Sequence, residues 1–291
     1  MNKIEIKSKT LDEYYKRLES YINQSNTKYN LDDLNCDLLY LFDKDFEEIV
    51  KLTPIEMEQL INKYQYKEFN KTILELKDLY ETVRNKWAVL ILDELDILVC
   101  PYCNREYIFK FEDTLKDEAR VIATLDHYYD KDTYPFLAVS LYNIIPSCHI
   151  CNSKFKHNKN FYEIKHLHPY VDDFDSLVKF KLEINDVSFY YKEDGFRIKL
   201  DTNDKKAQNS IETFRLDSVY KKHKNIALEI IKRNVIYNDD YIDELIKKYE
   251  GTLFNSKDEL IGLIHCDYID KKDINKRPLS KLTKDILEQI G

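Results

Sequence analysis

The chain has 291 residues, of which 34% are charged and 43% hydrophobic, and its formal net charge is −8. This length allows one large domain or two small domains with a proper core. The sequence has no run of about 18 apolar residues, which excludes a membrane-spanning helix, and the first residues lack the apolar stretch of a signal peptide. We therefore expect a cytoplasmic protein.

Residues 1–97 have the pattern of a helical region. Apolar residues recur at helical spacing in residues 11–22, behind Thr10 as a possible N-cap. Further helices are expected at 31–50, from Thr53 onward and at 71–98. Thr53 and Glu56 have the spacing of a capping box, with Pro54 in the first turn. The chain has only four glycines, none of them before Gly195, so helix should dominate.

From Cys100 the pattern changes to short strands. Residues 106–112 and 119–128 are predicted strands, and His127 lies near the end of the second one. A loop at 129–142, a short strand at 143–147 and a helix at 152–158 should follow. This region therefore predicts a strand, a loop, a strand and a helix in succession.

The C-terminal part combines a small sheet with helices. Three strand-like runs at 178–184, 187–191 and 196–200 predict an antiparallel meander. Helices are expected at 205–233, 239–250, 257–265 and 279–290. The sequence thus predicts an α+β, mostly helical fold in three regions: 1–97, 98–165, and 166–291.

Four of the six cysteines form two Cys-x-x-Cys pairs, Cys100 with Cys103 and Cys148 with Cys151. Two such pairs provide the four thiolates that tetrahedral Zn²⁺ prefers. In a cytoplasmic chain this pattern indicates a metal site and not a disulfide framework. We therefore predict a structural zinc ion. The two other cysteines, Cys36 and Cys266, are expected to be small buried side chains.

Histidine, aspartate and asparagine residues lie between the two cysteine pairs and directly after the second pair. His127 is a base with a pKa near neutrality, and Asp126 and Asn152 offer oxygen atoms suited to Mg²⁺ or Mn²⁺. Together with Asn143, this order of residues resembles the HNH (ββα-metal) endonuclease motif over roughly residues 98–160. The alternation of side chains along a strand would send Asp126 and His127 to opposite faces, so a shared site requires a twist or bulge.

The resemblance implies a role for each of these residues. His127 would be the general base that activates water for phosphodiester hydrolysis. Asp126 and Asn152 would hold the catalytic Mg²⁺ or Mn²⁺ ion. Asn143 would bridge backbone groups of the loop and orient the histidine. Nucleic acid, with DNA as the expected form, would be the substrate.

The segment from Asn143 to Cys148 and the later run from His168 to Phe174 are similar to a bacterial subgroup of this family. In that subgroup the PtuB-like nuclease subunit of Septu-type anti-phage systems acts beside an ATPase. The resemblance implies antiviral defence and a PtuA-like ATPase partner. The chain has no Gly-rich phosphate loop of its own, so any ATP dependence must come from another polypeptide. We expect the helical regions at 1–95 and 205–291 to bind it.

Other interpretations of these residues stay open. Asn152 can instead cap the helix after the second cysteine pair, and His157 can replace the third histidine of the family motif. His149, His166 and His168 are expected to be structural or surface histidines. The four cysteines alone fit a non-catalytic zinc ribbon that binds nucleic acid or a partner equally well. An acyl or amide hydrolase is disfavoured, since its nucleophile and metal motifs are missing.

Lysines gather after Asn152 in an otherwise acidic chain. Lys154, Lys156 and Lys159 follow the predicted metal ligand directly and are expected to contact the nucleic-acid backbone. Two later basic runs, at 219–234 and 271–284, are more typical of solvated helix faces. The acidic balance suggests that a partner supplies part of the affinity for the substrate.

Overall fold

A computed structural model describes residues 2–64, 68–114 and 118–291 of the chain. These residues form two compact units. The N-terminal unit consists of Lys3–Ile97 and Ile108–Asp172, and the C-terminal unit of Asn2, Leu98–Tyr107 and Asp173–Gly291. Leu98–Tyr107, which carries the first cysteine pair, thus groups with the C-terminal part of the chain.

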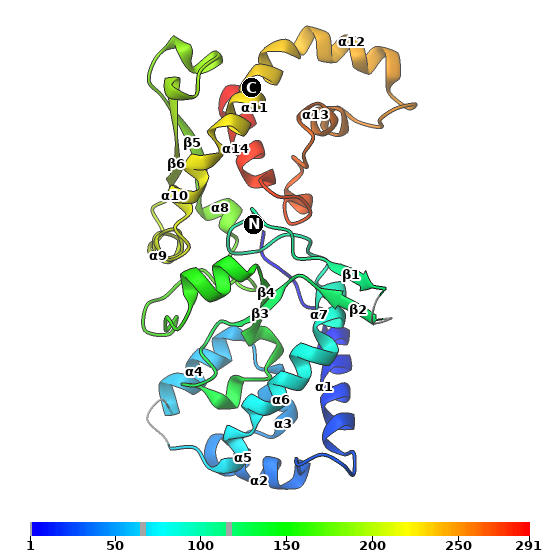
Figure 1. The fold of residues 1–291 in the computed structure, drawn as a ribbon, viewed down its shortest axis with the longest axis vertical. Helices are drawn as coiled ribbons and strands as arrows, with labels where there is room; N and C mark the ends of the chain where they lie inside the picture. Colours follow the sequence, from blue (N-terminus) through cyan, green and yellow to red (C-terminus); the bar gives the residue numbers. More distant parts are fainter. Residues whose placement is uncertain (1, 65–67, 115–117) are drawn as a thin grey trace. The chain divides into compact units, whose positions relative to one another are not determined.

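The N-terminal unit begins with a series of amphipathic helices (Figure 1). The longest, α1, buries Tyr14, Leu18 and Ile22 on one face. The helix expected at 31–50 is divided, because Asp43 adopts a left-handed conformation with φ 56° at the end of α2. The helices of this part are α1 (Ser8–Ile22), α2 (Leu31–Phe42), α3 (Phe46–Lys51), α4 (Pro54–Tyr64), α5 (Lys71–Leu74), α6 (Leu76–Thr82), the π-helical turn η1 (Val83–Trp87) and α7 (Ala88–Leu95).

One predicted helix start is confirmed and another is wrong. The backbone N–H of Thr53 donates to the Glu56 carboxylate at 2.8 Å, and the N–H of Glu56 reaches the Thr53 hydroxyl at 3.4 Å, as in a capping box. Thr10, in contrast, lies inside α1, which begins at Ser8. Its hydroxyl donates to Glu94 at 3.0 Å, so it fastens α1 to α7 and caps neither.

The strands of the N-terminal unit form two separate antiparallel hairpins. β1 (Lys110–Asp113) pairs with β2 (Glu118–Val121), and β3 (Thr124–His127) pairs with β4 (Ile144–Ser147). The single strand expected at 119–128 is therefore two strands that belong to different sheets. After β4 the chain enters the π-helical segment η4 (Ile150–Lys156). The 3₁₀ turns η2 (Pro135–Leu137) and η3 (Leu141–Asn143) lie in the loop that joins β3 to β4.

The C-terminal unit contains one two-stranded sheet, β5 (Lys179–Ile184) with β6 (Phe196–Asp201). The predicted middle strand is wrong, since residues Val187–Tyr190 form the 3₁₀ turn η5. A Cβ atom at Gly195 would lie 2.3 Å from the Phe189 nitrogen, so this close approach requires glycine. The other elements are α8 (Phe174–Leu177), η6 (Glu193–Gly195), α9 (Lys205–Thr213), α10 (Leu216–Tyr220), η7 (Lys221–His223), α11 (Lys224–Ile236), α12 (Asp239–Tyr249), α13 (Lys257–His265), η8 (Lys271–Asp273) and α14 (Ser280–Ile290).

Helix α14 is fixed to α8 and β5 by a buried ionic cluster. The Lys281 ammonium is fully buried and lies 2.5 Å from the Asp285 carboxylate and 3.0 Å from that of Asp175. Asp285 also accepts a hydrogen bond of 2.8 Å from the backbone N–H of Phe180 in β5. Because each buried charge here is paired, the cluster orients the helix without leaving an unpaired ion in the core.

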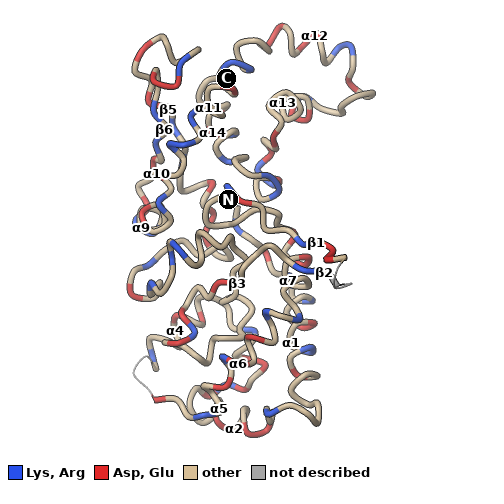
Figure 2. Tube along the Cα trace, in the orientation of Figure 1, with Lys and Arg blue, Asp and Glu red and all other residues tan. Residues whose placement is uncertain are grey.

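The fold class is confirmed as mostly helical with small antiparallel sheets, and helices account for 55% of the described residues. Figure 2 shows that lysines and arginines alternate with aspartates and glutamates along helices such as α1, as expected for solvated faces. Among the described residues, no helix is long and apolar enough to cross a membrane.

Candidate metal centre and adjoining cleft

The four predicted cysteines form one buried cluster. The sulfur atoms of Cys100, Cys103, Cys148 and Cys151 all lie within 4.8 Å of one another, and none of these side chains is more than 6% exposed. Zn–S bonds of about 2.3 Å in a tetrahedron place sulfur atoms about 3.8 Å apart, which this cluster can satisfy. The donor set and its geometry therefore fit a metal ion such as zinc.

Both cysteine pairs lie in the same kind of turn, and each is followed by an asparagine. The backbone N–H of Asn104 donates to the Cys100 carbonyl at 2.8 Å, and that of Asn152 donates to the Cys148 carbonyl at 3.0 Å. In the second turn the N–H of Cys151 also points at the Cys148 sulfur at 3.4 Å. A backbone donor at a sulfur atom favours the thiolate form that a metal requires.

The first turn is fastened from several sides. Asn104 is fully buried with φ 51°, and its side chain donates to the Ile274 carbonyl at 2.9 Å and accepts from the Lys281 N–H at 3.1 Å. The Tyr220 hydroxyl donates to the Cys103 carbonyl at 2.7 Å. These bonds fix the turn before any metal binds, so the two thiols are held in a preorganised position.

His127 lies at the end of β3 and is only 8% exposed. Its Nε2 lies 2.8 Å from the Ala138 carbonyl oxygen, which can only accept, so Nε2 carries the proton. Nδ1 therefore carries the lone pair. The Tyr80 ring packs edge-on against the imidazole with centroids 4.1 Å apart. Burial lowers the pKa of His127 to about 4, so the ring is neutral at pH 7 and Nδ1 is unprotonated.

Asn143 holds the loop that contains the partner of His127. Its Nδ2 donates to the carbonyls of Tyr129 and Leu137, both at 3.0 Å, and its Oδ1 accepts from the Tyr129 N–H at 2.7 Å. Leu137 directly precedes Ala138, whose carbonyl accepts the hydrogen bond from the Nε2–H group of His127. Asn143 thereby fixes the loop against β3, and the loop in turn fixes the tautomer and direction of the imidazole.

Asp126 points away from His127, because β3 keeps regular register with β4 through both residues. Its Oδ1 lies 3.1 Å from the Lys156 ammonium in η4, and both side chains are less than 5% exposed. The same ammonium donates to the His127 carbonyl at 2.5 Å and lies 4.9 Å from the Phe161 ring centroid. An ion bound by Asp126 would have to share this carboxylate with Lys156 or displace it.

Asn152 lies on the Asp126 face of β3 and does not cap a helix. It is the third residue of η4, where His149 occupies the cap position, and its Nδ2 donates to the Thr124 hydroxyl at 3.1 Å. Among the described residues no hydrogen bond is made to its Oδ1. This oxygen is therefore the atom that Asn152 can offer to a ligand.

The structure thus separates the predicted site residues into two groups. Asp126 and Asn152 share the face of β3 that η4 covers, together with Lys156. His127 instead turns its ring toward Ala138 and Tyr80 on the other face. The bulge that would bring both groups to one point is not present in the β3–β4 register.

The lysines predicted to contact nucleic acid differ in their exposure. Lys154 and Lys159 are exposed, and the Lys159 ammonium donates to the Phe155 carbonyl at 2.8 Å. Lys156 is only 2% exposed and is bound to Asp126 and the His127 carbonyl, so it does not reach the solvent where a phosphate would lie. In this structure it is a buried counter-ion.

The other histidines of this region have structural surroundings. His166 stacks on Phe161 with ring centroids 3.7 Å apart, and burial lowers its pKa to about 4. His168 is buried beside Tyr128, 4.1 Å between centroids. His149 is on the surface and contacts Ser153, and the exposed His157 ends η4 with φ 49°.

A polar cleft of about 620 Å³ opens in the N-terminal unit beside Asn152. One wall is formed by Tyr80 at the end of α6 and by residues of η1 and α7, and the other by β2 and β3. Asn152 and Ser153 contribute from η4. The lining residues are Tyr80, Arg84, Asn85, Lys86, Ala88, Val89, Ala119, Arg120, Val121, Ala123, Thr124, Leu125, Asn152 and Ser153.

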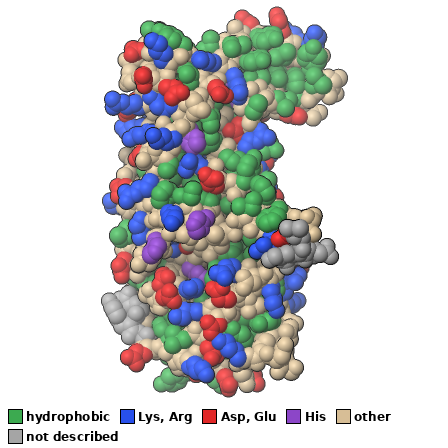
Figure 3. Space-filling view, viewed as in Figure 1, with side chains coloured by type: hydrophobic (Ala, Val, Ile, Leu, Met, Phe, Trp, Pro, Cys, Tyr) green, Lys and Arg blue, Asp and Glu red, His purple; other side chains and the backbone are tan. Residues whose placement is uncertain are grey.

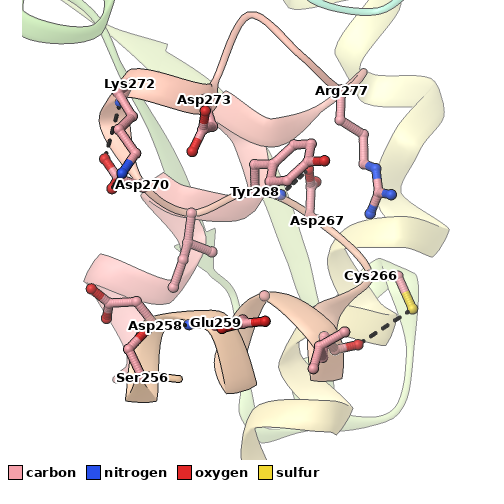
Figure 4. Close-up of a pocket in the computed structure, with 13 residues that line it drawn as sticks. Ser256, Asp258, Glu259, Cys266, Asp267, Tyr268, Asp270, Lys272, Asp273 and Arg277 are labelled. Atoms are coloured by element: carbon pink, nitrogen blue, oxygen red, sulfur yellow. Dashed lines mark hydrogen bonds and ion pairs between the residues drawn. The ribbon is translucent and has the colours of Figure 1, made fainter. Parts of the chain in front are cut away.

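A second cavity, of about 610 Å³, lies in the C-terminal unit between α13 and η8 (Figure 4). Several acidic side chains line it, but they are engaged locally. Asp267 accepts from the hydroxyls of Ser280 and Thr283 at 2.5 and 2.6 Å, and burial raises its pKa. Lys272 pairs with Asp270 at 3.1 Å. This cavity contains none of the predicted site residues.

The two remaining cysteines contradict the expectation that they are buried. Cys36 and Cys266 are both exposed. Cys266 ends α13 with φ 55°, and its thiol contacts the Leu263 carbonyl at 3.7 Å. An end position in the left-handed conformation explains the exposure, since the side chain projects beyond the helix into solvent.

No family model, curated protein or solved structure matches this chain. The structure adds two residues to the site that the sequence did not indicate, Tyr80 and Ala138. Tyr80 packs on His127 and donates its hydroxyl to the Leu125 carbonyl at 2.6 Å. Ala138 acts through its backbone. The sequence has 23 tyrosines and nothing distinguishes Tyr80 from the others, and a backbone carbonyl leaves no trace in the residue types. Neither contribution could therefore be predicted from the sequence.

Proposed function

We propose that the chain is a metal-dependent HNH endonuclease that hydrolyses phosphodiester bonds of nucleic acid, with DNA as the expected substrate. The observation that carries the proposal is the environment of His127. A neutral imidazole, with its Nε2 proton held by a backbone carbonyl and its Nδ1 lone pair unprotonated, has the protonation state of a general base.

In the proposed reaction Nδ1 of His127 removes a proton from a water molecule as the water oxygen forms a bond to phosphorus. The bond from phosphorus to the 3′ oxygen breaks, and the leaving oxygen takes a proton from solvent. Asn143 keeps the imidazole aimed by fixing the loop that carries Ala138. Proton transfer is slow from a water molecule to a misdirected base, so the cleavage rate should depend on this loop as well as on the histidine.

Asp126 and Asn152 would hold the catalytic Mg²⁺ or Mn²⁺ ion. Their carboxylate and amide oxygens are hard donors on one face of β3, which suits either ion. When bound, such an ion neutralises charge that develops on the phosphate. Without the ion, the Lys156 ammonium keeps the buried Asp126 carboxylate paired. A metal ion that binds Asp126 would have to compete with this ammonium. The four-cysteine zinc ion is coordinatively closed and takes no part in the reaction.

The proposal is tested with the purified chain and two single variants. His127→Ala should lower the rate of cleavage of plasmid DNA, measured with added Mg²⁺ or Mn²⁺, by roughly 10²–10⁴. Its zinc content and circular dichroism should match the wild type. His149→Ala is the matched control, because that histidine is on the surface. Wild-type turnover in His127→Ala would eliminate the proposed base.

The alternative is a zinc ribbon that binds nucleic acid or a partner without cleaving it. The same experiment separates the two classes. A ribbon would bind labelled nucleic acid with no turnover in any metal, and His127→Ala would then change nothing. What supports the nuclease is the fixed tautomer of the buried His127, for which binding alone gives no reason.

We further propose that the nuclease acts as the effector of an antiviral system together with an ATPase subunit. Figure 3 shows hydrophobic side chains gathered over α12 and α13, and among the apolar residues of this part Leu253 and Leu263 are 68% and 57% exposed. Exposed apolar area of this kind is typical of an interface. Co-expression with an adjacent ATPase followed by size-exclusion chromatography tests this. Strictly monomeric elution with full, unregulated activity would contradict it.

A further inference from the structure

The cleft beside Asn152 differs in charge from the rest of the chain. Three cations, Arg84, Lys86 and Arg120, are among its lining residues, and none of the described residues that line it is an aspartate or glutamate. The whole chain, in contrast, has a net charge of −8. A local reversal of charge inside a cleft raises the local concentration of anions.

The three cations come from two elements of the cleft lining, η1 and β2. Arg84 and Lys86 belong to η1, where a π-helical turn interrupts the helical run from α6 to α7. Arg120 belongs to β2, which contacts α7. π-helical turns change the direction of side chains along a helix and occur often at functional sites. The geometry therefore places positive charge on both walls.

These cations are accessible to a ligand. Arg84 is 52% exposed and pairs with Glu81 at 2.6 Å, and Arg120 is 48% exposed and pairs with Asp113 at 3.3 Å. Glu81 is 44% exposed, and an exposed pair such as Arg84–Glu81 contributes only about 0–1 kcal/mol, whereas Asp113 is 15% exposed. A phosphate group can therefore compete with Glu81 for Arg84, and solvent reaches about half of the Arg120 side chain.

An exposed aromatic side chain lies next to this basic wall. Phe111 is 40% exposed and stands directly opposite Arg120 in the β1–β2 pairing. Residues that pair directly across two antiparallel strands project from the same face. An aromatic ring beside an arginine is the combination by which proteins bind unpaired bases and the adjoining phosphates. A base-paired strand does not offer a free base face to such a ring.

We propose that this cleft binds the sugar-phosphate backbone of an unpaired nucleic-acid strand and leads it to Asn152. Arg84 and Arg120 contact phosphates on the two walls, and Phe111 stacks on a base just outside the cleft. This assignment rests on the proposed nuclease function and adds its substrate class. It also moves the main phosphate contacts from the lysines after Asn152 to Arg84 in η1 and Arg120 in β2.

The test measures binding in a His127→Ala background, where the probe stays intact. Fluorescence anisotropy is recorded with a short labelled single strand of DNA, its RNA equivalent and the corresponding DNA duplex. Arg84→Gln and Arg120→Gln should each weaken single-strand binding roughly tenfold, the loss of one charged hydrogen bond. Each should also reduce the slope of log affinity against log salt by about 0.7.

Two further variants complete the design. Phe111→Ala should weaken single-strand binding roughly tenfold and leave duplex binding unchanged, because only an unpaired base stacks on the ring. Arg197→Gln is the matched control, since Arg197 is exposed on β6 in the other unit and should have no effect. Zinc content and the fluorescence of Trp87 serve to show that each variant is folded.

The outcomes separate the cleft from the chemistry. Equal binding by Arg84→Gln, Arg120→Gln and Arg197→Gln, or no binding of any probe, would overturn the cleft assignment. A duplex that binds as tightly as the single strand, with Phe111→Ala unchanged, would overturn the substrate class. If the double variant Arg84→Gln/Arg120→Gln, with His127 intact, cleaves as fast as the wild type, the cleft assignment is refuted and the proposed nuclease function stands. If binding depends on the arginines but no cleavage occurs under any condition, the nuclease function is refuted and the cleft assignment stands.

Discussion

Replacing Lys156 by methionine tests the arrangement around Asp126 most directly. The substitution keeps much of the side-chain volume but leaves the buried Asp126 carboxylate without its counter-ion. It also removes the hydrogen bond to the His127 carbonyl and the contact with the Phe161 ring. Breaking a buried ion pair from one side costs about 3–5 kcal/mol, and we expect the free energy of unfolding to fall by this amount.

Urea denaturation followed by tryptophan fluorescence provides the assay. Trp87 is the only tryptophan of the chain and lies in η1, so its signal reports on the unit that contains Asp126. With a urea slope near 3 kcal/mol per molar, the midpoint of Lys156→Met should fall by about 1–1.7 M. Lys159→Met is the control, because Lys159 is exposed and its ammonium donates to a backbone carbonyl that solvent can reach.

Divalent metal turns this measurement into a test of the metal site. If Asp126 is a ligand, millimolar Mg²⁺ or Mn²⁺ should stabilise Lys156→Met more than the wild type, because the ion no longer competes with an ammonium. The measurement uses buffers without added chelator, so that the predicted zinc ion is not removed from the four cysteines. A loss of stability below about 1 kcal/mol would refute the energetic argument. Equal effects of the metal on both proteins would refute Asp126 as a ligand.

Three further outcomes are expected. Wild-type protein should contain one zinc ion per chain by elemental analysis, and Cys148→Ser should release it and give protease-sensitive protein; rapid alkylation of all four thiols in native protein would contradict the site. Asn143→Ala should lower kcat for cleavage with little change in KM while zinc stays bound, since three hydrogen bonds that fix the loop are lost; full activity would remove Asn143 as a positioning residue. Burial, and to a lesser extent the charge of Arg233, lowers the pKa of His265 to about 4. The unfolded chain therefore binds more protons than the folded chain below about pH 6.5. The free energy of unfolding should fall as the pH drops from about 6.5 to 4, by up to about 1.4 kcal/mol per pH unit. Thermal unfolding of His265→Gln should be less sensitive to this range of pH, and an unchanged pH profile would contradict the argument.

Local patterns in the sequence determined most helices and the four cysteines of the candidate metal site. Caps, apolar spacing and the scarcity of glycine act over a few residues, so Thr53 and Glu56 form the predicted capping box. Two cysteines with two residues between them can both turn their thiols toward one ion, and the four cysteines of the two pairs do form one cluster. The predicted middle strand is instead the turn η5, where Gly195 approaches the Phe189 backbone more closely than a Cβ atom would allow.

Only the tertiary structure decided what surrounds the polar residues. The tautomer of His127 depends on the Ala138 carbonyl, 11 residues away in a loop that Asn143 holds. Lys156, which looks like a phosphate ligand in the sequence, is buried because η4 packs along β3 and brings it to Asp126. The basic cleft joins η1 to β2, two segments that a linear pattern cannot connect. Hydrogen bonds and ion pairs depend on position in space, and residue spacing predicts that position only within one element.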